Sequence, residues 1–286
     1  MITVVGGTGR LGRLVTARLV ADGNPVRVVA RSAPSTPVPR AEFVAADVRT
    51  PASLPAALTG SRVVVSAMHG MDPTAGESPS SVDRDGNRTL VRAAGEVGAD
   101  IVLVSIVGAS DNHPIELFRM KAAAEAALLE EATARGVGWT IVRAAAFADM
   151  WLELFRSSAG RSGVPKVMGP GRNTVNFVAV DDVAVAVARA ATDSTLRGRT
   201  IEVAGENLSE TELASLVTTP GKPPTHIPAP LVWMVGNVLR PFRPSLARVA
   251  RQALAMERVP MRTDPDPGHA EYPWLPLTPI SALAGP

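Results

Sequence analysis

The chain of 286 residues contains no cysteine. This absence excludes disulfide bonds, thiolate metal sites and catalysis by a cysteine nucleophile. The sequence also lacks an apolar run of about 20 residues, the length that a membrane-spanning helix needs. No basic stretch followed by an apolar signal segment stands at its beginning. We therefore expect a cytoplasmic protein that has no membrane partner.

The chain also contains few aromatic residues and has a net charge close to zero. Aromatic residues make up 4% of the chain, and its single tyrosine is Tyr272. Lysine and arginine number 29 against 27 acidic residues, which gives a net charge of +2. The arginines are scattered, whereas direct nucleic-acid binding needs a basic stripe on one face. A hydrophobic content of 46% and a charged content of 20% are typical of a globular protein with a sizeable core.

The first twelve residues carry the strongest pattern in the chain. Ile2 to Val5 form a short β-branched run, typical of a strand buried on both faces. Glycines follow, and apolar residues at helical spacing begin directly at Leu11. In a dinucleotide-binding fold, Gly6 allows a tight turn, Gly9 lets the backbone approach a pyrophosphate, and Gly12 lets the helix pack closely. The helix N-terminus then attracts phosphate. A glycine-rich turn in another kind of α/β protein is the alternative.

The spacing G-x-x-G-x-x-G resembles that of the short-chain dehydrogenase/reductase superfamily, in particular its extended and atypical branches. Three further segments resemble the NmrA-like, NAD(P)H-binding group of atypical members: Asp85-Gly86-Asn87 in a helix, Lys121 four residues before Glu125, and the strand Trp139-Thr140-Ile141-Val142-Arg143. The resemblance spans about residues 1–215. It implies an α/β fold, a Rossmann-like doubly wound parallel sheet with a smaller C-terminal lobe.

The resemblance also suggests a division of the chain. Residues 1–159 are expected to form the Rossmann core, and residues 160–286 a lobe that covers the substrate. The lobe is interleaved with the core and includes the late strands 175–180 and 200–204. Two helices near 231–239 and 246–256 cover the cleft or pair with a second copy in a homodimer. Residues 263–286 are rich in proline, and we expect an irregular tail there.

Two arginines favour NADP over NAD as the cofactor. Arg31 and Ser32 follow the predicted strand 26–30, where a Rossmann fold meets the adenosine ribose. An acidic residue there binds a 2′-hydroxyl, whereas arginine suits a 2′-phosphate. Arg10 adds a second arginine in the glycine loop. The alternative is that both arginines are solvated surface residues.

The remaining cofactor contacts follow from the resemblance and from strand ends. The pair Asp47-Val48 resembles the one that meets the adenine, although Asp47 is also suited to cap a helix near Pro51. The segment Ala144 to Phe147 replaces the proline phrase of the NmrA-like group; its backbone is expected to lie against the nicotinamide amide, with Phe147 lining the substrate side. The residues predicted to bind the cofactor are Gly6, Thr8, Gly9, Arg10, Leu11, Gly12, Arg31, Ser32, Asp47, Val48, Ala67, Met68, Lys121 and Phe147.

The usual proton donor of the superfamily is missing. Its members carry Tyr-x-x-x-Lys on one helix face, but here Leu117 stands four residues before Lys121. Lys121 is predicted to bond the nicotinamide ribose, or else to be a surface lysine paired with Glu125. Ser105 matches the position whose hydroxyl faces the nicotinamide. His69 follows a strand end and is either a proton donor or incidental. The candidate catalytic residues are therefore Lys121, Ser105 and His69, and no metal site is expected.

These features favour an NADP(H)-dependent oxidoreductase whose small-molecule substrate is a quinone-like, enone or aromatic carbonyl compound. Met68, Phe147 and Trp151 are apolar residues expected to hold it. Conjugated acceptors delocalise the developing negative charge, so the missing tyrosine matters less than for a simple ketone. The alternative is an NmrA-like regulatory protein that senses NADP without catalysis. Epimerase or isomerase chemistry is neither supported nor excluded by the sequence.

Overall fold

The computed structural model describes residues 1–71, 76–238, 242 and 244–285, and its chain forms two compact units. The first unit contains Met1–Ala144, Val180–Val203 and Tyr272–Pro276. The second contains the rest of the described chain, that is, Ala145–Ala179 and most of the residues after Val203. The chain thus crosses between the two units several times. That the residues after 159 cover a substrate stays a prediction.

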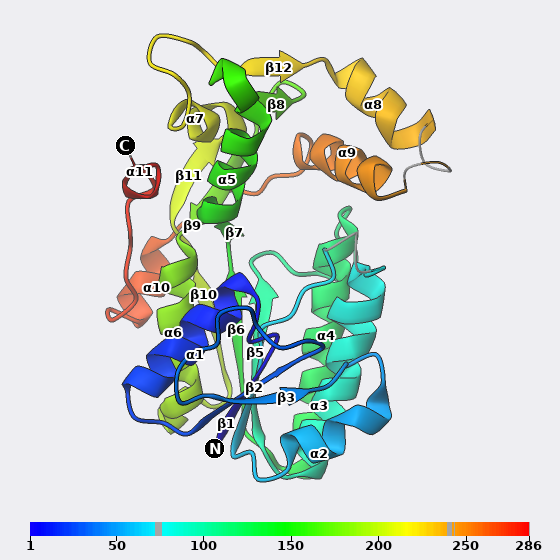
Figure 1. The fold of residues 1–286 in the computed structure, drawn as a ribbon, viewed down its shortest axis with the longest axis vertical. Coiled ribbons are helices and arrows are strands. Elements are labelled where there is room, and N and C mark those ends of the chain that lie inside the picture. Colours follow the sequence, from blue (N-terminus) through cyan, green and yellow to red (C-terminus); the bar gives the residue numbers. More distant parts are fainter. Residues whose placement is uncertain (72–75, 239–241, 243, 286) are drawn as a thin grey trace. The chain divides into compact units, whose positions relative to one another are not determined.

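The first unit is built on a seven-stranded sheet with the order β3-β2-β1-β4-β5-β6-β10 (Figure 1). Neighbouring strands pair in parallel throughout this sheet. The strands are β1 (Ile2–Val5), β2 (Val26–Ala30), β3 (Glu42–Ala45), β4 (Val63–Ser66), β5 (Asp100–Ile106), β6 (Trp139–Ala144) and β10 (Arg199–Val203). The order reverses between β1 and β4, which is the switch point of a doubly wound fold. The predicted fold class is confirmed.

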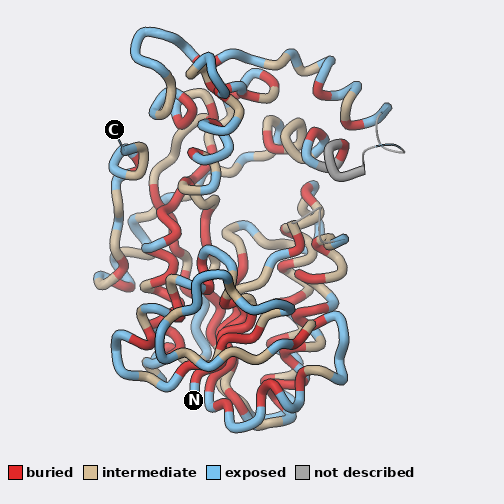
Figure 2. Tube along the Cα trace, in the orientation of Figure 1, coloured by how far each residue is buried: buried red, intermediate tan, exposed pale blue. Residues whose placement is uncertain are grey.

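Helices cover both faces of this sheet (Figure 1). α1 (Arg10–Ala21) packs with α6 (Val180–Thr192) on one face. The other face carries α2 (Leu54–Leu58), α3 (Asn87–Glu96) and α4 (Glu116–Arg135). The central strands β1 and β4 are buried along their whole length, and Figure 2 shows the red centre of the unit. This burial explains why β1 and β4 consist of β-branched residues with one serine.

A π-helix precedes α3, and the sequence pattern did not reveal it. The sequence predicts a helix through Asp85-Gly86-Asn87, whereas the structure has a π-helix over Pro79–Gly86 that continues into α3. Ser78 and Ser81 cap its N-terminus reciprocally. A Cβ atom at Gly86 would lie 2.8 Å from Val48 Cγ2, so glycine is needed for this close approach. Val48 is consequently 7% exposed and belongs to the core.

The second unit contains two small sheets. A three-stranded sheet has the order β11-β9-β7, with β7 (Ala146–Phe147), β9 (Thr174–Val178) and β11 (Glu206–Ser209), and a two-stranded sheet joins β8 (Lys166–Met168) to β12 (Thr225–Ile227). Its longer helices are α5 (Ala148–Ala159), α8 (Ala229–Val238) and α9 (Pro244–Met256), and α7 (Glu210–Ser215) is short. The end of the predicted helix 231–239 lies outside the described residues.

The expected irregular tail is partly wrong. It contains two short helices, α10 (Asp266–Glu271) and α11 (Ile280–Leu283). Between them Tyr272–Pro276 returns to the first unit. Tyr272 is 7% exposed, and its ring lies 5.8 Å from that of Trp274, which in turn lies under the Arg189 guanidinium. Packing against a distant segment explains this order, which proline content alone does not reveal. Within the part of the chain that is described, no helix is both long and apolar enough to cross a bilayer.

Candidate functional site

The glycine loop after β1 can be built only with glycine at two positions. Gly6 has a φ of +80°, and a Cβ there would lie 2.7 Å from the carbonyl oxygen of Ala67, which follows β4. A Cβ at Gly12 would lie 2.3 Å from the carbonyl oxygen of Gly6. The amide of Gly9 donates to that same Gly6 oxygen at 3.0 Å. The turn and the start of α1 are therefore folded tightly against the ends of β1 and β4.

The N-terminus of α1 is suited to bind an anion. Gly9 is its N-cap and provides no side-chain cap, and the amide of Arg13 is the first to bond back, to Gly9. The amides of Leu11 and Gly12 precede this first intrahelical bond, and first-turn amides point along the axis toward the helix N-terminus. A Cβ at Gly9 would meet only the Gly6 oxygen, at 3.3 Å. Amides at a helix N-terminus, the helix dipole and an open approach over Gly9 suit a pyrophosphate.

Gly12→Ala is expected to lower nucleotide affinity at least about tenfold and to destabilise the first unit by about 1–3 kcal/mol. The new methyl group meets backbone, which cannot move aside as a flexible side chain can. Titration with NADPH and thermal unfolding measure the two effects. Arg13→Ala, on the exposed side of the same turn, is the matched control. Unchanged affinity in Gly12→Ala would refute this role of the loop.

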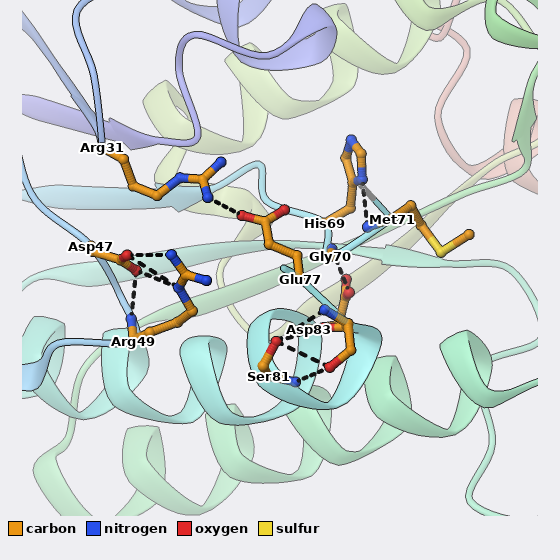
Figure 3. Close-up of polar contacts among 10 residues, drawn as sticks. Arg31, Asp47, Arg49, His69, Gly70, Met71, Glu77, Ser81 and Asp83 are labelled. Atoms are coloured by element: carbon orange, nitrogen blue, oxygen red, sulfur yellow. Dashed lines mark hydrogen bonds and ion pairs between the residues drawn. The ribbon is translucent and has the colours of Figure 1, made fainter. Parts of the chain in front are cut away.

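Four charged residues gather where the adenosine ribose is predicted to lie, and Figure 3 shows them as two ion pairs. Arg31 Nη1 lies 2.5 Å from Glu77 Oε1. Arg49 binds Asp47 through Nε and Nη2, and this hydrogen bonding holds the pKa of Asp47 below its usual range. The helical turn at Pro51–Ser53 has no side-chain cap, so Asp47 does not cap it as the alternative proposed.

Glu77 and Arg49 were not predicted from the sequence. Together with Arg31 and Asp47 they form a group that we call the ribose corner, or simply the corner. Glu77 stands in a polar loop, outside any motif, and its contact with Arg31 joins segments 46 positions apart. Arg49 was detectable in principle, because it follows Asp47 by two residues at a strand end. Ser32 is exposed next to Arg31. Whether these residues bind a nucleotide stays a prediction.

Lys121 is a buried residue that connects three segments of the first unit, and it is not a surface residue. Its Nζ lies 3.0 Å from the Met68 carbonyl, 3.0 Å from the Val104 carbonyl and 3.0 Å from Asp83 Oδ1. Lys121 is 6% exposed and Asp83 is completely buried. The ammonium donates to the two carbonyls and forms an ion pair with the carboxylate. Lys121 thus ties the segments after β4 and within β5 to the π-helix.

The alternative pairing of Lys121 with Glu125 is wrong. Glu125 Oε2 instead accepts from Arg143 Nη2 at 2.7 Å, and this hydrogen bond raises the pKa of the Arg143 guanidinium. Asp83 also accepts from the Gly70 amide at 2.8 Å, as Figure 3 shows. Asn87 Nδ2 donates to the Asp83 carbonyl at 2.8 Å.

Ser105 has a buried hydroxyl whose hydrogen bonding is incomplete. The residue lies near the carboxyl end of β5 and is 4% exposed. Its Oγ has no hydrogen-bond partner among the described residues. Ser66, near the end of the adjacent strand β4, differs because its hydroxyl donates to Asn87 Oδ1 at 2.5 Å. Buried hydroxyls nearly always have a partner, so that of Ser105 is available to a bound molecule.

Two imidazoles lie in the loops after β4 and β5. His69 is exposed, and the Met71 amide donates to its Nδ1 at 3.3 Å, which places the proton of the neutral ring on Nε2 (Figure 3). Sequence reasoning missed His113. Its ring stacks on Phe118 at 3.9 Å, the Ile115 amide donates to its Nδ1 at 3.1 Å, and burial lowers its pKa. The position between β5 and α4 was the available signal.

The two aromatic residues predicted to hold the substrate belong to the second unit. Phe147 lies in β7 opposite Val178 and precedes α5. Trp151 is half-buried, and its ring lies 5.9 Å from both Phe155 and Phe177. Met68, in contrast, belongs to the first unit, where it packs against the core and its carbonyl binds Lys121.

The geometry of the first unit agrees with a comparison to known families. The model of a family described as NAD(P)H-binding matches residues 6–194. The chain belongs to this NAD(P)H-binding family. The matched region begins at Gly6 and includes the glycine loop, both corner arginines, Lys121 and Ser105.

A curated relative of this chain has a low sequence identity to it. The uncharacterized protein Rv2047c of Mycobacterium tuberculosis is 26% identical over 241 residues, or 82% of this chain. The chain spans only 25% of that relative's length.

Two solved structures share the fold over 99% of this chain. An NADPH-dependent quinone oxidoreductase of Escherichia coli, solved with NADPH, has a TM-score of 0.76, 19% identity and 98% of its own chain covered. A nucleoside-diphosphate-sugar epimerase of Staphylococcus aureus also has a TM-score of 0.76 and 19% identity, with 99% of its chain covered. At such identities the likeness concerns the fold alone, because one fold serves many chemistries.

Proposed function

We propose that this protein is an NADP(H)-dependent oxidoreductase that reduces a quinone-like, enone or aromatic carbonyl compound. Membership of the NAD(P)H-binding family provides the nucleotide part of the proposal. The observation that supports reduction is the unpartnered hydroxyl of Ser105, which lies in the same unit as the uncapped glycine-loop helix. A donor without a partner at the carboxyl end of a parallel sheet suits a substrate oxygen or the nicotinamide amide. The quinone oxidoreductase among the structural neighbours agrees with the substrate class.

The first unit fits the dinucleotide at several points. The amides at the start of α1 suit the pyrophosphate, and Asp47 and Val48 follow β3 where the adenine is proposed to lie. Arg31, which follows β2, is the proposed receptor of the 2′-phosphate. The cofactor supplies the hydride, and the protein orients it and excludes water.

The proton for the product is assigned to an imidazole or to water. Lys121 donates to two carbonyls and its charge is paired with Asp83, so we propose that it positions the Met68 carbonyl and Asp83. His69 and His113 both accept a backbone amide at Nδ1, which leaves an Nε2–H in each neutral ring. A conjugated acceptor tolerates such a weak donor, since its negative charge is delocalised.

Arg31→Ala is expected to weaken NADPH binding about tenfold and to leave NADH binding unchanged, because a charge-assisted contact to the 2′-phosphate contributes about 1.5–3 kcal/mol. Fluorescence titration of both nucleotides gives the comparison. Arg62→Ala is the matched control. This exposed arginine directly precedes β4, so it lies at the amino ends of the strands and not at their carboxyl ends, where the cofactor is proposed to bind. Equal losses for NADPH and NADH would contradict the proposed NADP preference.

A nucleotide sensor without catalysis is the second candidate function. Two observations favour it: Leu117 replaces the tyrosine acid, and Lys121 is engaged in the interior. Tight NADPH binding with no oxidation by a panel of quinones, enones and aldehydes would support the sensor over the reductase.

A further inference from the structure

Glu77 forms an ion pair with Arg31, the same guanidinium that is proposed to bind the 2′-phosphate of NADP(H). Its carboxylate lies 2.5 Å from Arg31 Nη1, and Figure 3 shows the two side chains reaching toward one another from different segments. The Glu77 side chain is 8% exposed, whereas that of Arg31 is 44% exposed. A carboxylate so shielded from water holds its cationic partner more firmly than an exposed one does.

The positive charge of this corner is already balanced. Arg49 is bound by Asp47, and Arg31 by Glu77. The pKa of Arg49 is raised mainly by its hydrogen bond to Asp47. The negative charge of Glu77 raises it further. Two arginines and two carboxylates thus cancel within this group. An entering phosphate monoester, with a charge of about −1.5 to −2, meets a neutral corner that contains a competing carboxylate.

We propose that Glu77 sets the cofactor preference by competing with the 2′-phosphate of NADP(H) for Arg31. Binding of NADP(H) requires the carboxylate to leave Arg31, whereas NAD(H) has no group that displaces it. A carboxylate at this corner also accepts a hydrogen bond from the ribose 2′-hydroxyl of NAD(H). Glu77 therefore narrows the preference for NADP(H) that Arg31 creates. This inference rests on the proposed function, because it concerns the same nucleotide site.

The test compares NADPH and NADH titrations of the wild-type protein and Glu77→Gln. The amide keeps the size of the side chain and removes its charge, so NADPH affinity is expected to rise about tenfold. NADH affinity is expected to stay the same or to fall a few-fold. Glu130→Gln makes the same charge change at an exposed position of α4 and is expected to alter neither affinity. Glu77→Ala repeats the test, with an intact thermal transition as the check of folding.

Two different failures can be told apart. If the wild-type protein binds a dinucleotide but the ratio of NADPH to NADH affinity is the same in Glu77→Gln, the competition is overturned and the proposed function stands. If the wild-type protein binds neither dinucleotide, both are overturned. A rise that is equal for NADPH and NADH would also overturn the competition, because it would show a general charge effect.

Discussion

Lys121→Met is expected to destabilise the protein by about 3–5 kcal/mol, the cost of breaking a buried ion pair from one side. The substitution leaves the carboxylate of Asp83 uncompensated at a position with no solvent exposure. It also removes the donor from the Met68 and Val104 carbonyls. Urea unfolding at neutral pH, followed by circular dichroism, measures the loss.

The double variant Lys121→Met/Asp83→Asn separates the ion pair from simple packing. Removing both charges is expected to recover much of the stability, because no buried charge then lacks a partner. Lys166→Met is the matched control, since this lysine is exposed in β8. A loss of unfolding free energy below about 1 kcal/mol in Lys121→Met would contradict a stabilising role of the buried Lys121–Asp83 ion pair.

Glu210→Gln is expected to stabilise the protein in alkaline solution. Glu210 begins α7 and is 4% exposed, and burial, followed by repulsion from Glu257, raises its pKa to about 7. In the unfolded chain the group ionises near its ordinary value of 4.5. Between these two values the folded state holds more protons, so stability falls as the pH rises through this window. The total penalty is up to about 3 kcal/mol above pH 7.

The amide variant cannot ionise, so its advantage grows with pH. Unfolding free energies of the wild-type protein and Glu210→Gln are expected to lie within about 1 kcal/mol of each other near pH 5 and to differ by about 2–3 kcal/mol near pH 8. Glu271→Gln, at an exposed position of the same unit, is the control and is expected to show no such trend. A difference that does not depend on pH would show that Glu210 is already ionised in the folded protein.

The parts of the fold that sequence reasoning predicted rest on local patterns. The predicted strand 2–5 and the helix pattern beginning at Leu11 correspond to β1 and α1, and the predicted strand Trp139 to Arg143 corresponds to β6. Each of these predictions depends on residues within a few positions of each other.

The predictions that failed or were missing depend on distant contacts. Lys121 and Asp83 are 38 positions apart, and nothing local distinguishes a buried lysine from an exposed one. Glu77 meets Arg31 only because the sheet order places the loops after β2 and β4 on either side of β1. The missing partner of the Ser105 hydroxyl likewise appears only when burial is known. The sequence thus located the strand ends with Arg31 and Asp47, but not the charged partners Glu77 and Arg49 that they meet there.

The most direct measurement is a fluorescence titration of the purified protein with NADPH, followed by NADPH oxidation with a panel of quinones, enones and aldehydes. The proposed function predicts saturable NADPH binding, tighter than that of NADH, and turnover with at least one conjugated acceptor. Binding without turnover across the panel would contradict the reductase and leave the nucleotide sensor. Absence of NADPH binding would contradict the nucleotide site itself.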